Sequence, residues 1–351
     1  MQVKIKDIDN IQKELKFELE NEDMDKYLDK AANRLSKEMK VKGFRDGKVP
    51  REVVESSVGK EKVWQEAAND AIQDSYWNEL DKKNIEPIGM PKINVTKLVP
   101  GSNLEFTATV PVMPELDLPD YKQIAQKTLG KEQKDVEVEE KEVDASLKWL
   151  QRSRTQADDG GEVKEEEDIE FNDEFAQSLG DFKNMEELRS SIKEGIKAEK
   201  EKQEKERVRL LILEHVREKT KDLKIPDLLV DQELDKMEEE FANQISRSGM
   251  TMEQYFEQAK TNREDVRKGW REKAEERVAT GILLRAIADE ENIEADPDEV
   301  EKEANKYLLQ FGSIEEAQKN IDPNRLKSYI SGIIRNEKVF ELLEGNKKEE
   351  K

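Results

Sequence analysis

Residues 43–50 read GFRDGKVP, and the glycines and lysine of this stretch are types that build phosphate-binding loops. Such a loop needs four residues between its two glycines and a Ser or Thr after the lysine. The backbone N–H groups then cradle the phosphates and the hydroxyl binds Mg²⁺. Here Gly43 and Gly47 enclose three residues, and Val49 follows Lys48. The spacing therefore predicts no nucleotide site at this turn.

Other residue types that support catalysis or metal binding are scattered along the chain. His215 is the only histidine and there is no cysteine, which excludes thiol catalysis and cysteine-based metal sites. A Ser/His/Asp triad needs a nucleophile motif and a metal site needs convergent ligands, and neither pattern is visible. The many Glu and Asp residues indicate solvated helix faces. We expect no catalytic residue, metal or cofactor, and an enzyme with an unrecognised carboxylate site is a remote alternative.

The turn is better suited to binding. From Arg34 to Arg51 the chain carries seven basic residues and two acidic ones, a local charge of +5 in a protein of net charge −22. The seven are Arg34, Lys37, Lys40, Lys42, Arg45, Lys48 and Arg51. One interpretation is an ordinary interhelical turn with a charged rim. The other is an anchor in which Phe44 supplies apolar contact while Arg45 and Lys48 meet RNA phosphate or an acidic protein.

The composition limits the fold and the partners. Of 351 residues, 34% are hydrophobic and 41% are charged, against globular averages of about 45–50% and about 25%. This polarity favours an elongated, helix-rich body over one large core. The net charge disfavours general binding of nucleic acid or anionic membrane, so RNA contact needs a local basic patch. The N-terminus lacks the apolar segment of a signal peptide and no run is long enough to span a membrane, so we expect a soluble cytoplasmic protein.

The segments around the turn predict an α+β module. Apolar residues alternate at Val3 and Ile5 and again at Leu15, Phe17 and Leu19, which indicates strands. A helical pattern precedes the turn, and one or two helices are expected after it. A hairpin follows, in which Ile93 and Val95 before the turn at 100–103 and Leu104 and Phe106 after it are the apolar strand residues. We expect this α+β domain to span residues 1–112.

Beyond the prolines at 111, 114 and 119, strand signals nearly vanish, so residues 113–351 are expected to form a helical domain. Residues 184–216 predict one long helix with a charged middle, and another helix is expected to start at Pro226. Asp296 and Asp322 each precede a proline, the pattern of an N-cap followed by proline at the first helical position.

The motif GFRDGKVP resembles the G-F-R-x-G-K-x-P signature of the trigger factor family, the ribosome-associated chaperones of bacteria. The resemblance continues in the same order in IEPIGMPKI, in FTATVPVMPELDLPDY and in IPDLLVDQELDKM, and it covers nearly the whole chain. It implies an α+β ribosome-binding domain and an elongated, mainly α-helical domain with protruding arms. The implied ribosome-binding residues are Gly43, Phe44, Arg45, Asp46, Gly47, Lys48 and Pro50.

Two departures from the family pattern matter. The family carries a peptidyl-prolyl isomerase domain of the FK506-binding type, whereas here ADDGGEVKEEED joins the flanking segments directly near residues 157–165. Isomerase activity is therefore expected to be absent. Asp46 stands where the family commonly has lysine, and its carboxylate should weaken docking on a negative surface.

The resemblance implies an ATP-independent chaperone that docks at the exit tunnel of the large ribosomal subunit, on ribosomal protein and rRNA, and shields nascent or unfolded chains. We expect no membrane partner, and the resemblance leaves room for a homodimer off the ribosome. The candidate client surface is Met237, Phe241, Ile245, Met250, Met252, Tyr255 and Phe256. Apolar residues at this spacing are usually core, so packing within the helical arm is the competing interpretation for each.

Two further alternatives remain. A free cytoplasmic holdase or assembly chaperone with weak or no ribosome binding would share most of these features. A periplasmic chaperone of the SurA type also combines helical arms with dispensable isomerase domains, but the N-terminal sequence argues against it.

Overall fold

The computed structural model describes all residues except 40–43, 45–48, 159–170, 310–320 and 346–351. It divides into two compact units. The first comprises Met1–Asp117 and Thr220–Ala286, and the second comprises Leu118–Lys219 and Ile287–Lys351. Both units are discontinuous in sequence, because the chain leaves the first unit and later returns to it. The domain division into residues 1–112 and 113–351 stays a prediction.

A four-stranded antiparallel sheet opens the first unit. Its strands are β1 (Gln2–Asp9), β2 (Gln12–Leu19), β3 (Lys92–Lys97) and β4 (Leu104–Pro111), in the order β1-β2-β4-β3. Alternate residues of the two central strands are buried, as strand periodicity predicts: Leu15, Phe17, Leu19, Leu104, Phe106, Ala108 and Val110. The rings of Phe17 and Phe106, paired across β2 and β4, stack at 4.5 Å.

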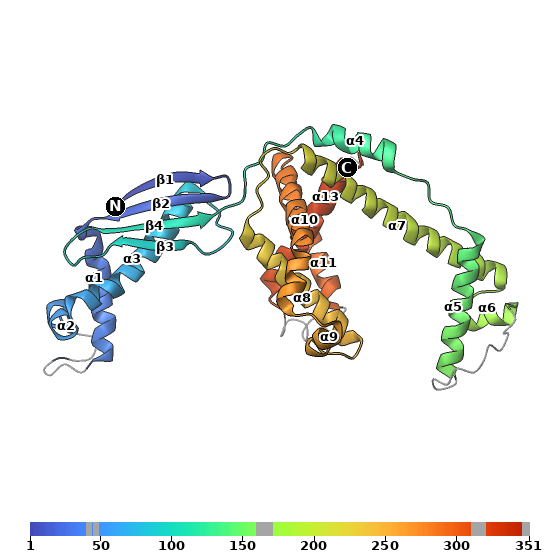
Figure 1. The fold of residues 1–351 in the computed structure, drawn as a ribbon, viewed down its shortest axis with the longest axis horizontal. Coiled ribbons are helices and arrows are strands. Elements are labelled where there is room, and N and C mark those ends of the chain that lie inside the picture. Colours follow the sequence, from blue (N-terminus) through green and yellow to red (C-terminus); the bar gives the residue numbers. More distant parts are fainter. Residues whose placement is uncertain (40–43, 45–48, 159–170, 310–320, 346–351) are drawn as a thin grey trace. The chain divides into compact units, whose positions relative to one another are not determined.

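Three helices complete the N-terminal α+β region: α1 (Asn21–Glu38), α2 (Arg51–Val58) and α3 (Lys60–Lys83). Figure 1 shows α1 and α3 on the same side of the sheet. The capping box of Glu20 and Asp23 begins α1. Gly59, at φ 92°, separates α2 from α3, because only glycine adopts this conformation without strain.

The edge strands are less covered than their sequence suggests. Val3 pairs with Phe17 and Ile93 pairs with Ala108, so these residues share the inner face of the sheet. Ile5, Ile93 and Val95 are nevertheless exposed, because the helices cover the centre of that face and not its margins. Strand identity was therefore predictable from alternation, but burial at the edges was not.

The first unit also contains α8 (Asp227–Arg247), α9 (Met252–Ala259) and most of α10 (Arg263–Glu290). Pro226 is the N-cap of α8, one residue before the start of the helix. The turn into α9 uses Gly249, at φ 79°, and a capping box of Thr251 and Gln254. These three helices are called the helical arm below.

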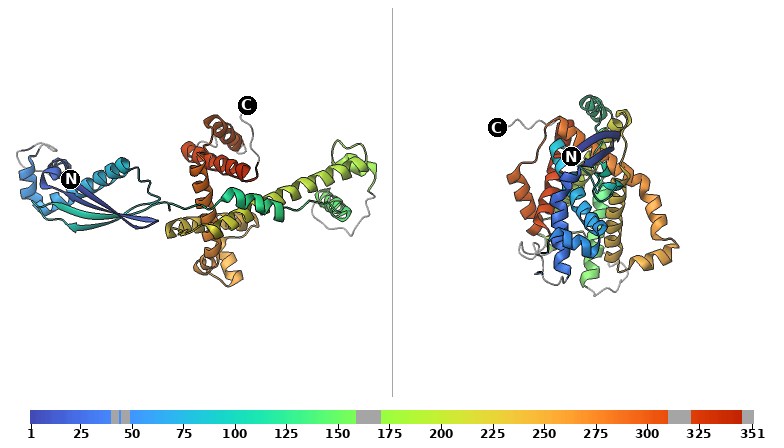
Figure 2. Two further views of the ribbon diagram at one scale, coloured as in Figure 1. Left: turned by 90° about the horizontal axis from the view of Figure 1, so that it is seen from above. Right: turned by 90° about the vertical axis from the view of Figure 1, so that its left-hand side faces the viewer.

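The described helices of the second unit are α4 (Tyr121–Glu132), α5 (Glu140–Asp158), α6 (Asp173–Leu179), α7 (Met185–Lys219), α11 (Pro297–Leu309) and α13 (Pro323–Leu343). Figure 2 shows α4 beside the long α7, where Thr128 and the Nδ1 atom of His215 lie 2.9 Å apart. The side chain of Asp322 accepts hydrogen bonds from the N–H groups of Asn324 and Arg325, which confirms the expected cap. Leu326, Ile330 and Ile334 of α13 pack on Val300, Ala304 and Leu308 of α11.

Candidate functional site

The first candidate surface is the GFRDGKVP loop, residues 43–50, which joins α1 to α2 (Figure 1). Phe44 is 44% exposed. Val49 is buried in the N-terminal core, and Pro50 is the N-cap of α2. The end of the motif is therefore anchored, while its aromatic residue remains on the surface. Five of the predicted ribosome-binding residues lie outside the described residues: Gly43, Arg45, Asp46, Gly47 and Lys48.

In the folded protein, the basic patch around the loop is less positive than the count along the sequence indicates. The guanidinium of Arg34 lies 2.9 Å from Glu66 and 3.2 Å from Asp70, both on α3. Hydrogen bonds to Asp70, opposed by burial and supported by Glu66, raise the pKa of Arg34. Acids distant in sequence therefore neutralise a cation that the local count left free. Among the described residues, Lys37 of α1 has no such partner.

Arg51, the other basic residue at the edge of the loop, is also paired. It lies 2.9 Å from Asp25 and 3.6 Å from Asp29 on α1, and 2.8 Å from Glu55 on its own helix. The +5 estimate therefore overstates the positive charge beside the loop, because α1 and α3 bring carboxylates to both arginines.

The second candidate surface is an aromatic cluster of the helical arm. It consists of Phe241, Tyr255, Phe256 and Trp270. The ring of Phe241 lies edge to face with Tyr255 at 4.9 Å and with Trp270 at 5.3 Å, the arrangement that aromatic quadrupoles favour. All four side chains are half-buried, so the cluster is held in place and still accessible.

The predicted client residues divide into two groups. Met237 and Ile245 are buried within the arm, whereas Phe241, Met250, Met252, Tyr255 and Phe256 are half-buried. Sequence reasoning missed Trp270. The signal in the sequence is the four-residue spacing of Trp270 and Ala274, which puts both on one face of a helix. In the structure this face of α10 packs on α8, and Ala274 is buried there.

Ion pairs join α8 to α10 around a small core of Val230, Leu234, Met237 and Ala274. Arg267 lies 2.7 Å from Asp235 and 2.9 Å from Glu238. Arg263 and Arg277 of α10 make further pairs with α8. Such surface pairs each stabilise weakly, but as a network they fix the helices that carry the aromatic cluster.

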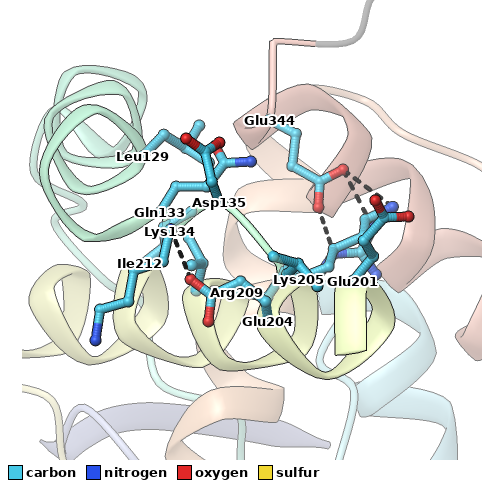
Figure 3. A pocket seen from close by; sticks show the side chains of 12 residues that line it. Leu129, Gln133, Lys134, Asp135, Glu201, Glu204, Lys205, Arg209, Ile212 and Glu344 are labelled. Carbon is cyan, nitrogen blue, oxygen red and sulfur yellow. Dashed lines mark hydrogen bonds and ion pairs between the residues drawn. The ribbon is translucent and has the colours of Figure 1, made fainter. Parts of the chain in front are cut away.

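A cleft of about 580 Å³ lies in the second unit between α4, α7 and the end of α13 (Figure 3). Figure 3 shows Glu344 pointing toward Arg209 and Lys205 of α7. The carboxylate of Glu344 lies 2.5 Å from Arg209 and 3.4 Å from Lys205. Burial disfavours the charged form of Arg209, but hydrogen bonds to Glu337 and Glu344 outweigh it and raise its pKa. These charges neutralise one another, which fits a structural contact between helices.

Replacing Arg209 with methionine should lower the free energy of unfolding by about 1–2 kcal/mol, because Glu344 loses its closest partner in a site only partly open to water. The side chains of Arg209 and Glu344 are 13% and 10% exposed. Arg189→Met is the matched control, since Arg189 is more exposed and pairs with the exposed Glu140 and Asp144. Urea unfolding measures both variants, and equal midpoints for the two would contradict this role.

Among the described residues, no group of three or more His, Asp or Glu side chains could hold a metal ion. None of the helices in the described ranges has the length and apolar character needed to cross a membrane.

Comparisons with known proteins identify relatives along nearly the whole chain. Residues 1–150 match the family model described as bacterial trigger factor protein, and residues 184–344 match the model of the C-terminus of the same family. A protein of Halothermothrix orenii named trigger factor is 28% identical, with 94% of this chain and 93% of the relative covered. One of Halalkalibacterium halodurans is 27% identical, with 85% and 87% covered.

A solved structure, described as "Promiscuous Substrate Recognition in Folding and Assembly Activities of the Trigger Factor Chaperone", has a similar fold. The TM-score is 0.57 at 19% sequence identity, with 98% of this chain and 99% of that chain covered. The sheet-containing N-terminal region and the mainly helical remainder expected from the sequence agree with this fold.

Proposed function

The chain belongs to the bacterial trigger factor family, and from this premise we propose that it is a cytoplasmic, ATP-independent chaperone of nascent chains. It docks beside the exit tunnel of the large ribosomal subunit through the GFRDGKVP loop and shields apolar client segments with the aromatic cluster. The family is one of ribosome-associated chaperones. The finer assignments rest on the two surfaces described above.

The exposed Phe44 carries the docking proposal. A large aromatic side chain on a surface loop is the type of residue that dominates binding energy when a partner buries it. Arg45 and Lys48 follow it in the sequence, carry positive charge and match the family signature, whereas Asp46 stands where the family commonly has lysine. We therefore expect the affinity for the ribosome to be lower than that of a variant with lysine at position 46.

The aromatic cluster and the methionines beside it carry the client proposal. Half-buried rings can gain further burial when an apolar segment lies across them, which drives binding without sequence specificity. Met250 and Met252 can adapt to different clients, because methionine is flexible and polarizable. The net charge of −22 keeps the chaperone soluble while it holds apolar chains.

One observation favours the second candidate, a free holdase with weak or no ribosome binding. Arg34 and Arg51 are engaged by carboxylates, so fewer cations beside the loop can meet rRNA. Co-sedimentation with ribosomes at low and physiological salt separates the two functions. Pelleting with the large subunit supports docking, whereas a protein that stays in the supernatant at both salt concentrations is the free holdase, with or without homodimers.

The purified protein is expected to have no prolyl isomerase activity. Residues 151–183, which separate the two matched ranges, are too few for a further domain of about 100 residues, the commonest size. The measurement is the refolding of a reporter whose rate is limited by proline isomerisation, with this protein at substoichiometric concentration. Catalytic acceleration would contradict the prediction, whereas an effect that requires equimolar protein would reflect chaperone binding.

A further inference from the structure

The first residue of α2, Arg51, connects two helices beside the loop. Its guanidinium lies 2.9 Å from Asp25 and 3.6 Å from Asp29 on α1, and 2.8 Å from Glu55 one turn along α2. Asp25 and Asp29 are four residues apart on one face of α1, so a single planar guanidinium reaches both helices. Arg51 and these three acids are called the loop clamp below.

The apolar contacts of α2 are few. The helix has eight residues, of which Val54 is buried, and Val53 and Val58 pack half-buried against the N-terminal core. A helix of this length is unstable by itself in water. Val49, two residues before the start of α2, is buried and adds an apolar contact. The loop clamp adds ion pairs between the start of α2 and α1.

The same contacts disfavour a role for Arg51 in binding phosphate. The side chain is 29% exposed and three carboxylates lie around it. Together the four side chains carry a net charge of −2 at neutral pH. A phosphate approaching this arginine would meet repulsion from the acids before it reached the guanidinium.

We propose that Arg51 is a positioning residue of the docking loop and makes no contact with the ribosome. It holds the start of α2 against α1, and so fixes the position of the C-terminal end of the loop, at Val49 and Pro50. This inference rests on the proposed ribosome docking. It differs from the sequence-based count, in which Arg51 belongs to the binding charge.

The two roles predict opposite effects when the acids are removed. In Asp25→Asn/Asp29→Asn, a phosphate-binding Arg51 would be released and ribosome affinity would rise. A positioning Arg51 keeps Glu55 on its own helix but loses both partners on α1, so affinity should fall about threefold to tenfold, the range expected for a partly buried ion-pair network. Asp74→Asn/Asp81→Asn on α3 is the matched control for the loss of two exposed acids. It should leave affinity unchanged or raise it slightly.

Arg51→Met provides a second variant with its own signature. Loss of a phosphate contact reduces the salt slope of binding, log K against log salt, by about 0.7–0.9. Loss of a positioning residue lowers affinity with the slope unchanged. Lys37→Met removes one cation from the same region without breaking a described ion pair, and so controls for net charge. A reduced slope for Arg51→Met together with tighter binding of Asp25→Asn/Asp29→Asn would overturn the proposal.

Hydrogen exchange of the free protein separates this inference from the proposed docking. In Arg51→Met and in the double Asp→Asn variant, backbone amides of α2 should exchange about threefold to tenfold faster, while those of α3 stay unchanged. If the wild-type protein does not bind ribosomes, the docking proposal fails, and faster exchange still establishes the clamp. Unchanged exchange in α2 for both variants refutes it.

Discussion

Replacing Phe44, Arg45 and Lys48 with alanine is expected to weaken binding to the large ribosomal subunit at least tenfold. The change removes the exposed aromatic side chain and two positive charges from one loop. Each contact at the centre of an interface contributes about 1–2 kcal/mol, so even strongly non-additive losses exceed one factor of ten. Equilibrium binding of labelled protein to purified subunits measures the effect.

Asp46→Lys tests the same surface in the opposite direction. It removes a charge that repels a negative partner and adds one that attracts it, so affinity should rise at low salt and the gain should shrink as salt screens the charges. Circular dichroism should show an unchanged fold for both variants, since the glycines and Pro50 remain. Equal affinity of the wild type and both variants at low salt would contradict docking through this loop.

Replacing Met252, Tyr255 and Phe256 with serine is expected to abolish most of the protection against aggregation. All three half-buried side chains belong to α9. If a client buries a further ~100 Å² of apolar surface in total on them, the loss is about 2.5 kcal/mol. The protein concentration for half-maximal protection should therefore rise at least tenfold. Light scattering of a denatured client diluted without nucleotide gives this concentration.

Trp77→Ser is the matched control for the loss of an exposed apolar side chain. Trp77 lies on α3 and is exposed, so its removal should leave protection unchanged. Circular dichroism checks that the arm of the triple-serine variant is still helical. Full protection by a folded triple variant would place the client surface elsewhere on the protein.

Local patterns in the sequence were sufficient to predict much of the architecture. Strand alternation identified β2 and β4, whose inner residues, Phe17 and Phe106 among them, form the core. The Asp-Pro pair at 322–323 predicted the start of α13, because an N-cap and a first-turn proline act within a few residues. The family signature predicted a loop between helices at residues 43–50.

Contacts between residues distant in the chain were not predictable from local patterns. The acids that pair with Arg34 come from α3 and those that pair with Arg51 come mainly from α1, so a count along the chain could not include them. Trp270 joined the candidate client surface only when α10 was placed beside α8 and α9. The exposure of Ile93 depends on how much of the sheet the helices cover, which alternation along one strand does not specify.

Crosslinking to a stalled nascent chain tests most directly whether loop docking and client binding act together. A photoreactive amino acid replaces Glu253, an exposed residue beside the aromatic cluster, and the protein is added to ribosomes that carry an apolar nascent segment just outside the tunnel. The account predicts an adduct with the nascent chain that falls at least tenfold when Phe44, Arg45 and Lys48 are also alanine. An adduct of equal yield with and without the loop residues, or no adduct with the intact loop, would contradict it.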